Sequence, residues 1–165
     1  MNHPERHATA SLKQLVPFNL DEWRCALDLW AVHRIIRVVE VTPLPNSPEI
    51  VLGVVNVQGE IIPVVNMRRR FGLPEGEAKL CEQMIIARTA KRAVALLVDS
   101  VGGVVERPTR EVTEAGKIVP GTQYLEGVAK TDEGILLIHD LNTFLSLEEE
   151  TQLNGALAET SVARK

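Results

Sequence analysis

Four histidines are the side chains of this chain best suited to metal binding or acid–base catalysis, and their spacing supports neither. They are His3, His7, His33 and His139. Only His3 and His7 are close enough in sequence to share a metal ion, and their polar N-terminal stretch, which we expect to be mobile, makes a poor site. The sequence also lacks the glycine patterns of a hydrolase elbow, a phosphate-binding loop or a dinucleotide-binding turn. We therefore expect no catalytic residue, no metal and no cofactor, and a protein that is not an enzyme.

Two carboxylates and a run of arginines are the remaining candidates for chemistry. Asp99 and Asp140 follow apolar strands at similar places in the two halves of the chain. They would need a shared cleft to act as a general acid and base, whereas turn and cap residues need no such partner, and we favour the structural role. The run Arg68-Arg69-Arg70 could hold an acidic partner, but a solvated face at a strand end is the interpretation we favour.

Composition and charge narrow the class of protein. The chain has 165 residues, 45% of them hydrophobic, and a formal net charge of -4, which is ordinary for a soluble globular protein. The mild acidity and the few aromatic residues (Trp 2, Tyr 1, Phe 3) argue against nucleic-acid binding. No apolar run resembles a signal peptide or a membrane span, so we expect a cytoplasmic protein. Cys25 and Cys81 lie in apolar segments and are expected to be buried, reduced thiols.

The positions of the apolar residues repeat within the chain. Gly53-Val54 returns 74 positions later as Gly127-Val128. An upstream stretch recurs at an offset of 69, where Ile35-Ile36 becomes Val104-Val105. Two copies are too few for a solenoid, and most of the apolar residues are β-branched, which favours strands. The sequence therefore predicts an all-β fold made of two similar small units packed on each other.

Each half has the same order of elements: a strand, a turn, a strand, a short helical or irregular segment, and a hairpin. In the first half we expect strands over 15–20 and 23–27, a short amphipathic helix over 29–36, a proline-rich loop, and a hairpin that turns at Gln58-Gly59. In the second half we expect strands over 83–87 and 93–98, a loop over 111–122, and a hairpin over 125–138. Residues 1–11 and 148–165 are expected to be flexible tails, the second of them helical or frayed.

Three segments resemble the CheW family of chemotaxis coupling proteins. They are Val32–Arg37 (VHRIIR), Thr42–Pro48 (TPLPNSP) and Gly53–Arg68 (GVVNVQGEIIPVVNMR). The order of these segments, followed by a second similar unit, is more specific than any one of them. The resemblance implies one CheW-like domain over 12–147, with similar halves at about 15–72 and 83–147. It also implies two five-stranded barrels of the SH3 type packed together, with a groove between them and a short helix in each half.

The resemblance further implies a non-catalytic adaptor with two partners. One is the cytoplasmic tip of methyl-accepting chemoreceptors, so contact with the membrane would be indirect. The other is the regulatory domain of the histidine kinase CheA. Receptor-helix binding needs aliphatic anchors in a groove, and the candidates are Val32, Arg34, Ile35 and Ile36 with Val104 and Val105. Plain core packing is the competing interpretation of these apolar residues. An exposed hairpin tip could meet the kinase, and its candidates are Val57, Gln58, Gly59 and Glu60.

The sequence departs from the family pattern at three places. Gln58 replaces an arginine in the hairpin, Arg34 replaces a glutamate, and Asn66-Met67-Arg68 replaces D-L-R. Such changes alter which charges a partner must present, so a divergent, non-chemotactic signalling system is one hypothesis. A small β-barrel enzyme or ligand-binding protein using the groove between the barrels is the alternative function, although the sequence offers no converging polar groups for a pocket.

Overall fold

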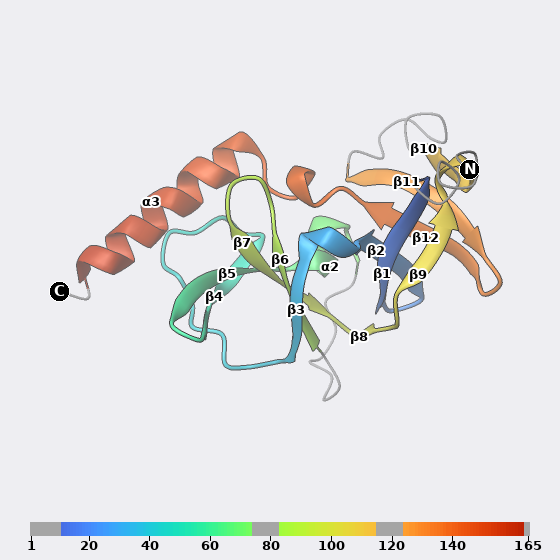
Figure 1. Ribbon diagram of the computed structural model, residues 1–165. Helices are drawn as coiled ribbons and strands as arrows, with labels where there is room; N and C mark the ends of the chain where they lie inside the picture. Colours follow the sequence, from blue (N-terminus) through green and yellow to red (C-terminus); the bar gives the residue numbers. More distant parts are fainter. Residues whose placement is uncertain (1–10, 74–82, 115–123, 164–165) are drawn as a thin grey trace, which may run out of the picture.

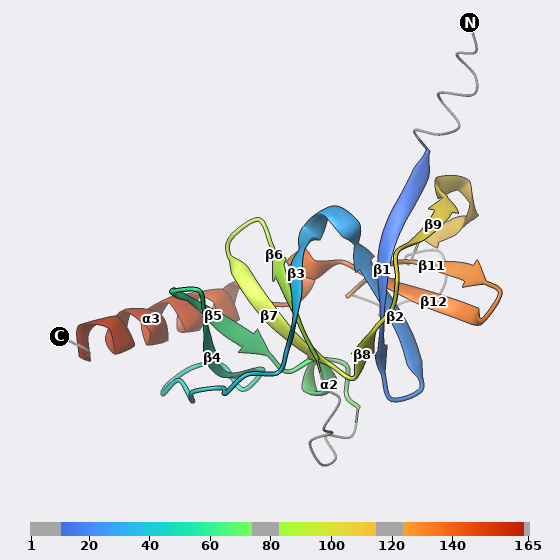
Figure 2. The same cartoon turned by 60° about the horizontal axis from the view of Figure 1, so that its bottom comes forward.

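The described residues of the computed structural model, 11–73, 83–114 and 124–163 with side chains up to Glu159, form two β-sheets and one long helix (Figure 1). The all-β class expected from the repeat is confirmed. Figure 2 shows the two sheets as neighbouring lobes, with α2 (Met67–Arg70) between them. Cys81, most of the tail expected over 1–11 and most of the loop expected over 111–122 lie outside the described residues.

The first sheet has seven strands in the order β10-β11-β12-β2-β1-β8, with β9 also paired to β1. The β2–β12 pair is parallel, and the other pairs are antiparallel. The strands are β1 (Leu12–Leu20), β2 (Trp23–Asp28), β8 (Ser100–Val101), β9 (Val105–Pro108), β10 (Val112–Glu114), β11 (Leu125–Thr131) and β12 (Gly134–His139).

The second sheet has five strands in the order β3-β6-β7-β5-β4. Its single parallel pair joins β5 to β7, at the place that β12 and β2 hold in the first sheet. The strands are β3 (Val32–Arg37), β4 (Val51–Val57), β5 (Glu60–Val65), β6 (Gln83–Arg88) and β7 (Ala93–Val98). The two sheets therefore share one strand plan, as two similar units require.

The two halves of the chain exchange hairpins. The β1–β2 hairpin of the first half pairs with β12 of the second, while the β6–β7 hairpin of the second half pairs with β3 and β5 of the first. The boundary between the sheets therefore does not coincide with the boundary between the sequence repeats. Strands far apart in the chain must pair before either sheet is complete, so neither half can form its own sheet alone.

The repeated glycines have a packing reason. A Cβ on Gly53 would lie 2.2 Å from the backbone oxygen of Thr42, and one on Gly127 would lie 2.7 Å from that of Thr113. The crossing segments pair with the residue after each glycine, Thr42 with Val54 and Thr113 with Val128. The sequence repeat thus marks two places where one backbone passes over another and no side chain fits.

One apolar cluster joins the two sheets. It contains Phe18 and Leu27 from the first sheet together with Ile85 and Leu96 from the second, and all four side chains are at most 1% exposed. Two smaller clusters lie within single sheets, around Met84 in the second and around Leu136 in the first. The shared cluster fixes the relative position of the sheets, and so the shape of any groove between them.

Two short 3-10 turns lead into corresponding strands, and the first corrects a sequence prediction. Only η1 (Leu29–Ala31) is helical in the segment where a helix over 29–36 was expected, and Val32–Arg37 is strand β3. The helical spacing of its apolar residues was misleading because β3 carries apolar side chains on both faces. The second turn, η2 (Thr109–Glu111), leads into β10 in the same way. The short helical piece of each half instead follows its last strand, as α2 and as η4 (Leu141–Thr143).

The C-terminal segment is a 17-residue helix, α3 (Leu147–Ala163), so the helical alternative is the observed one. It begins with a capping box, in which the Ser146 hydroxyl accepts the Glu149 N–H and the Glu149 carboxylate accepts the Ser146 N–H. Leu153 and Ala156 are buried in the shared core, and Figure 1 shows the helix running beside the second sheet. No helix among the described residues is long and apolar enough to cross a membrane.

Candidate functional site

Strand β3 carries four of the residues predicted to bind a receptor, and it lies at the edge of the second sheet. Its two faces differ. Val32 and Ile36 are half-buried and pack on apolar clusters, so core packing accounts for much of their role. Ile35 is 41% exposed, and His33 and Arg37 share its outward side. Ile35 is therefore the one apolar candidate on β3 that a partner could reach directly.

The other two predicted receptor residues lie on the first sheet. Val104 is 52% exposed in the turn between β8 and β9, and Val105 pairs with Leu15 and is half-buried. This segment corresponds to β3, because both border the first strand of a β-hairpin, β1 in one sheet and β6 in the other. The predicted equivalence of the two segments fits this plan, but among the interactions of the described residues no hydrogen bond or ion pair joins them.

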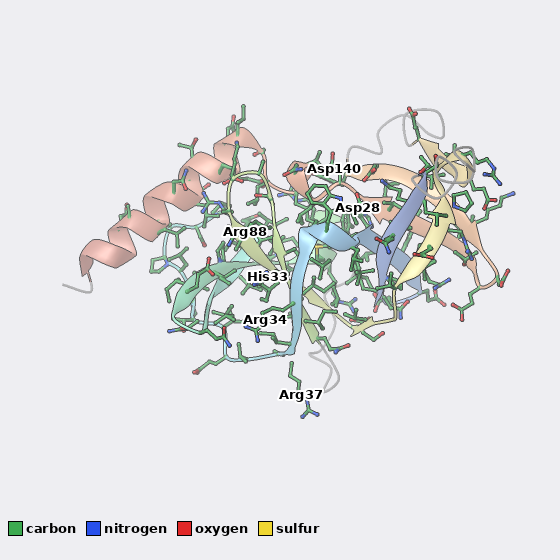
Figure 3. The ribbon with its side chains drawn as sticks, in the orientation of Figure 1. Asp28, His33, Arg34, Arg37, Arg88 and Asp140 are labelled. Atoms are coloured by element: carbon green, nitrogen blue, oxygen red, sulfur yellow. The ribbon has the colours of Figure 1, made fainter. Side chains whose placement is uncertain are left out.

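A groove of about 410 Å³ opens beside η1 between the two sheets. The Asn142 amide oxygen accepts the Ala90 N–H at 2.8 Å across this groove. Its charged lining is mostly acidic, from Asp28, Glu126 and Asp140, with Arg88 as the cation. Figure 3 shows Asp28 and Asp140 near the start of β3, with His33, Arg34 and Arg37 following along the strand. The surface thus changes from acidic to basic along the β3 edge.

Trp30 lines this groove and is 85% exposed, although no motif in the sequence marked it as a candidate. Exposure of so much of the apolar indole surface to water is unfavourable, and a binding partner that covers this surface would gain free energy. The available signal was compositional, since Trp30 is one of two tryptophans, and it lies in η1 two residues before β3. Ile35 on β3 and Val104 between β8 and β9 are further exposed apolar side chains.

The predicted kinase-binding tip is a tight hairpin turn. Gln58 and Gly59 have φ of 52° and 90°, and the Asn56 side chain accepts the Gly59 N–H at 2.8 Å. Gln58, Gly59 and Glu60 are exposed and Val57 is half-buried. The adjoining Ile61 is 38% exposed, so the tip carries an apolar residue that a protein partner could cover.

The arginine run is not the solvated face that the sequence suggested. Arg68 bonds to Asp21 at 2.6 Å and to Asp99 at 2.5 Å, and these bonds raise its pKa above the ordinary value, the one to Asp21 most. Arg69 donates to the Glu49 carbonyl, and Arg70 pairs with Glu149. The run therefore ties α2 to the first sheet and to α3.

Replacing Arg68 should break a link between the sheets. Asp99 also accepts the Asp21 N–H at 2.7 Å, and the side chains of Arg68 and Asp99 are 13% and 11% exposed. Removing one member of a buried ion pair leaves the other charge desolvated. We expect Arg68→Met to lower the free energy of unfolding by about 3 kcal/mol in urea titrations. The matched variant Arg69→Met, at an exposed position, should cost at most about 1 kcal/mol. Equal losses from both would contradict this role.

Asp99 and Asp140 do not form an acid–base pair. Asp99 belongs to the Arg68 network, whereas Asp140 caps η4 by accepting the Asn142 N–H at 3.1 Å. Both have the structural roles favoured from the sequence.

Cys25 is buried, and desolvation raises the pKa of its thiol to about 12. Among the described residues no cluster of three metal-binding side chains occurs.

Comparison with known proteins assigns the fold to a family. The family model for the CheW-like domain matches residues 14–149. The chain belongs to the CheW-like domain family. It is similar to the chemotaxis protein CheW of Thermotoga maritima, 31% identical over 142 residues that cover 86% of this chain and 92% of the relative. The CheW of Rhizobium meliloti is 26% identical over 151 residues, covering 90% and 97%.

A solved structure supports the same fold. The crystal structure of the scaffolding protein TtCheW from Thermoanaerobacter tengcongensis superposes with a TM-score of 0.77. The two chains are 29% identical, over 83% of this chain and 94% of the other. The CheW resemblance and the all-β fold with two sheets are therefore confirmed.

The departures from the family pattern have different structural weights. Asn66 caps α2 by accepting the Arg69 N–H, and Arg68 holds the inter-sheet network, so this departure keeps a structural role. Gln58 occupies an exposed turn position with positive φ, and Arg34 lies half-buried on the edge strand. Gln58 and Arg34 are therefore at positions that a partner could contact.

Proposed function

We propose that this chain is a non-catalytic adaptor that couples the cytoplasmic tips of methyl-accepting chemoreceptors to a CheA-type histidine kinase. Family membership supports the adaptor role, and its solved neighbour is described as a scaffolding protein. The observation that carries the proposal is a pair of exposed apolar side chains, Trp30 in the groove between the sheets and Ile35 farther along the β3 edge. An adaptor works through such surfaces. We place it in the cytoplasm, with membrane contact only through receptors and no nucleic-acid partner.

The receptor surface in this proposal is the β3 edge with the η1 groove. An amphipathic receptor helix would place aliphatic residues against Ile35 and Trp30, and truncation of such central apolar anchors usually costs the most affinity. The charges along the surface would orient the helix, with basic residues toward Asp28 and Asp140 and acidic ones toward Arg34 and Arg37. Val104 and Val105 would contribute from the first sheet.

The kinase surface in this proposal is the hairpin tip from Val57 to Glu60, extended by Ile61. The tip lies on β4 and β5, away from β3 in the strand order of the second sheet, although Glu60 reaches Arg88 of the η1 groove at 3.8 Å. A kinase bound on the far side of the tip would leave the β3 edge open to a receptor, as a coupling protein requires. Gln58 lacks the charge of the arginine in the family pattern, so the kinase that it meets would be a matching, divergent one. Co-purification of a kinase and receptors from the same genome tests this pairing, and recovery of neither class would refute it.

A charged residue at position 35 should remove receptor binding. We expect Ile35→Asp to weaken binding to a soluble receptor-tip fragment at least tenfold in calorimetry, because an aspartate cannot enter an apolar contact without losing its hydration. Circular dichroism and thermal melting show whether the variant folds. Ile135→Asp is the matched control, since Ile135 is 57% exposed on β12, outside both surfaces. If both variants bind normally, or if Ile35→Asp does not fold, the assignment of Ile35 to the surface is wrong.

The charge at position 34 should select the receptor. We expect Arg34→Glu to strengthen binding to receptors of relatives that carry glutamate there, by several-fold at low salt, and to weaken binding to the cognate receptor. Arg110→Glu makes the same charge change at an exposed position in η2, outside both surfaces, and serves as the control for net charge. Identical responses of the two variants would contradict a specific role for Arg34.

A further inference from the structure

The turn between β6 and β7 forms one wall of the η1 groove. Residues 88–90 contribute to the lining of this groove, together with residues of η1 and the start of η4. The turn belongs to the second sheet, whereas η4 follows β12 of the first sheet. The width of the groove therefore depends on where the β6–β7 turn is held relative to η4.

Hydrogen bonds within the β6–β7 turn make it a rigid unit. The Thr89 hydroxyl oxygen accepts the N–H groups of Lys91 at 3.1 Å and of Arg92 at 3.0 Å, and the Thr89 N–H donates to the Arg92 carbonyl at 2.8 Å. A hydroxyl that bonds to the backbone two and three residues ahead stabilises a tight turn. A force that moves Arg92 therefore moves the rest of the turn, and with it the wall of the groove.

Two contacts hold this turn from outside, and they differ in strength. The Ala90 N–H donates to the Asn142 amide oxygen at an exposed place, where water competes for both groups and the net gain is small. On the other side, Arg92 Nε donates to Glu150 at 2.8 Å, and Nη2 donates to the Asn154 amide oxygen. The side chains of Arg92 and Glu150 are only 15% and 9% exposed. Loss of one partner from such a buried ion pair is strongly destabilising, so Arg92 is the main anchor.

Both acceptors of Arg92 lie on α3, and Figure 1 shows the β6–β7 turn beside the first turns of this helix. The helix is a fixed reference, because Leu153 and Ala156 pack into the apolar cluster that joins the two sheets. Arg92 and its two acceptors lie outside the lining of the groove. They can therefore affect a bound partner only through the position of the turn.

We propose that Arg92 is a positioning residue for the receptor site, which holds the β6–β7 turn to α3 through Glu150 and Asn154. This inference rests on the proposed binding of a receptor helix in the η1 groove. With the turn held, residues 88–90 are a preformed wall, and binding does not have to order them. With the turn released, the receptor loses affinity although none of the groups that it contacts has been removed.

The matched pair of variants is Arg92→Met and Arg70→Met. Each removes an arginine whose side chain is mostly buried and that pairs with the first turns of α3, but Arg70 bonds to Glu149 and Tyr124 and has no contact with the β6–β7 turn. In calorimetry with a soluble receptor-tip fragment from the same genome, we expect Arg92→Met to bind at least fivefold more weakly than the wild-type chain. Arg70→Met should bind within twofold of it.

Glu150→Gln releases the turn from the helix side and keeps the shape of the side chain. We expect it to weaken receptor binding in the same direction as Arg92→Met, and it serves as the test if Arg92→Met does not fold. Amide hydrogen exchange at Ala90, measured by NMR on the receptor-free chain, follows the turn directly. Exchange should be at least fivefold faster in Arg92→Met and in Glu150→Gln than in the wild-type protein, and unchanged in Arg70→Met.

The proposal is overturned if Arg92→Met and Arg70→Met weaken receptor binding equally. It is also overturned if the exchange rate at Ala90 is the same in the wild-type chain, Arg92→Met and Glu150→Gln. A wild-type chain that binds no receptor fragment would instead refute the adaptor function itself. The two failures are therefore distinguishable, because the first appears only in the variants and the second already appears in the wild-type protein.

Discussion

Replacing Gly53 by alanine is expected to lower the free energy of unfolding by about 3 kcal/mol or more, among the largest effects of any single methyl group in this chain. The added Cβ would lie 2.2 Å from the Thr42 oxygen and 2.8 Å from its carbonyl carbon. Both are backbone atoms, held by the two hydrogen bonds of 2.8 Å between Thr42 and Val54. The clash cannot be relieved by a side-chain rotation, so the crossing must separate. Urea unfolding at neutral pH measures the change.

Two other glycines serve as controls. Gly127→Ala places its Cβ 2.7 Å from the Thr113 oxygen, at the equivalent crossing of the first sheet, and should destabilise for the same reason. Gly103→Ala meets no atom within 4 Å and should change stability by less than about 0.5 kcal/mol. If Gly53→Ala and Gly103→Ala unfold at the same urea concentration, close backbone approach does not explain the repeated glycines.

Local signals in the sequence were sufficient for the hairpins and for the class of fold. The Gln58-Gly59 turn and the recurring Gly-Val pairs depend on neighbouring residues, and the structure has them where they were predicted. The prediction of a helix over 29–36 was wrong because the apolar residues of this segment fit a helical spacing as well as a strand. Ile35 stays exposed on β3, and an exposed apolar residue removes the alternation that normally identifies a strand.

The pairing of strands that are distant in the chain could not be predicted from the sequence. The hairpin exchange joins β2 to β12 and β5 to β7, and no local pattern records which distant strand will be the partner. The prediction for the arginine run was wrong for the same reason. Arg68 and Arg70 pair with carboxylates that are distant in sequence, namely Asp21, Asp99 and Glu149. The candidate site follows this division. Ile35, the hairpin tip and a groove between the barrels were expected from the family resemblance, whereas the exposure of Trp30 depends on how the sheets pack.

Acid should destabilise this protein through His139. Burial is the main cause that lowers the pKa of His139 to about 4, and the nearby Tyr124 backbone offsets it only in part. The unfolded chain protonates this imidazole near pH 6.5 while the folded protein keeps it neutral, so the unfolded state binds more protons between those values. The stabilising contribution of neutral His139 is therefore fully present above about pH 7, and it is lost as the pH falls toward 4. We expect a loss of about 2 kcal/mol between pH 7.5 and pH 5.

The variant His139→Phe isolates this contribution. It cannot be protonated, yet it keeps a ring against Phe71, 4.5 Å from the present imidazole. The carboxylates, His33 and the arginine pairs are common to both proteins, so they cancel in the comparison. The variant should lose about 2 kcal/mol less than the wild-type chain when urea unfolding is repeated at pH 5. Parallel losses in the two proteins would mean that His139 takes up a proton in the folded protein as readily as in the unfolded chain, which would contradict its burial as a neutral imidazole.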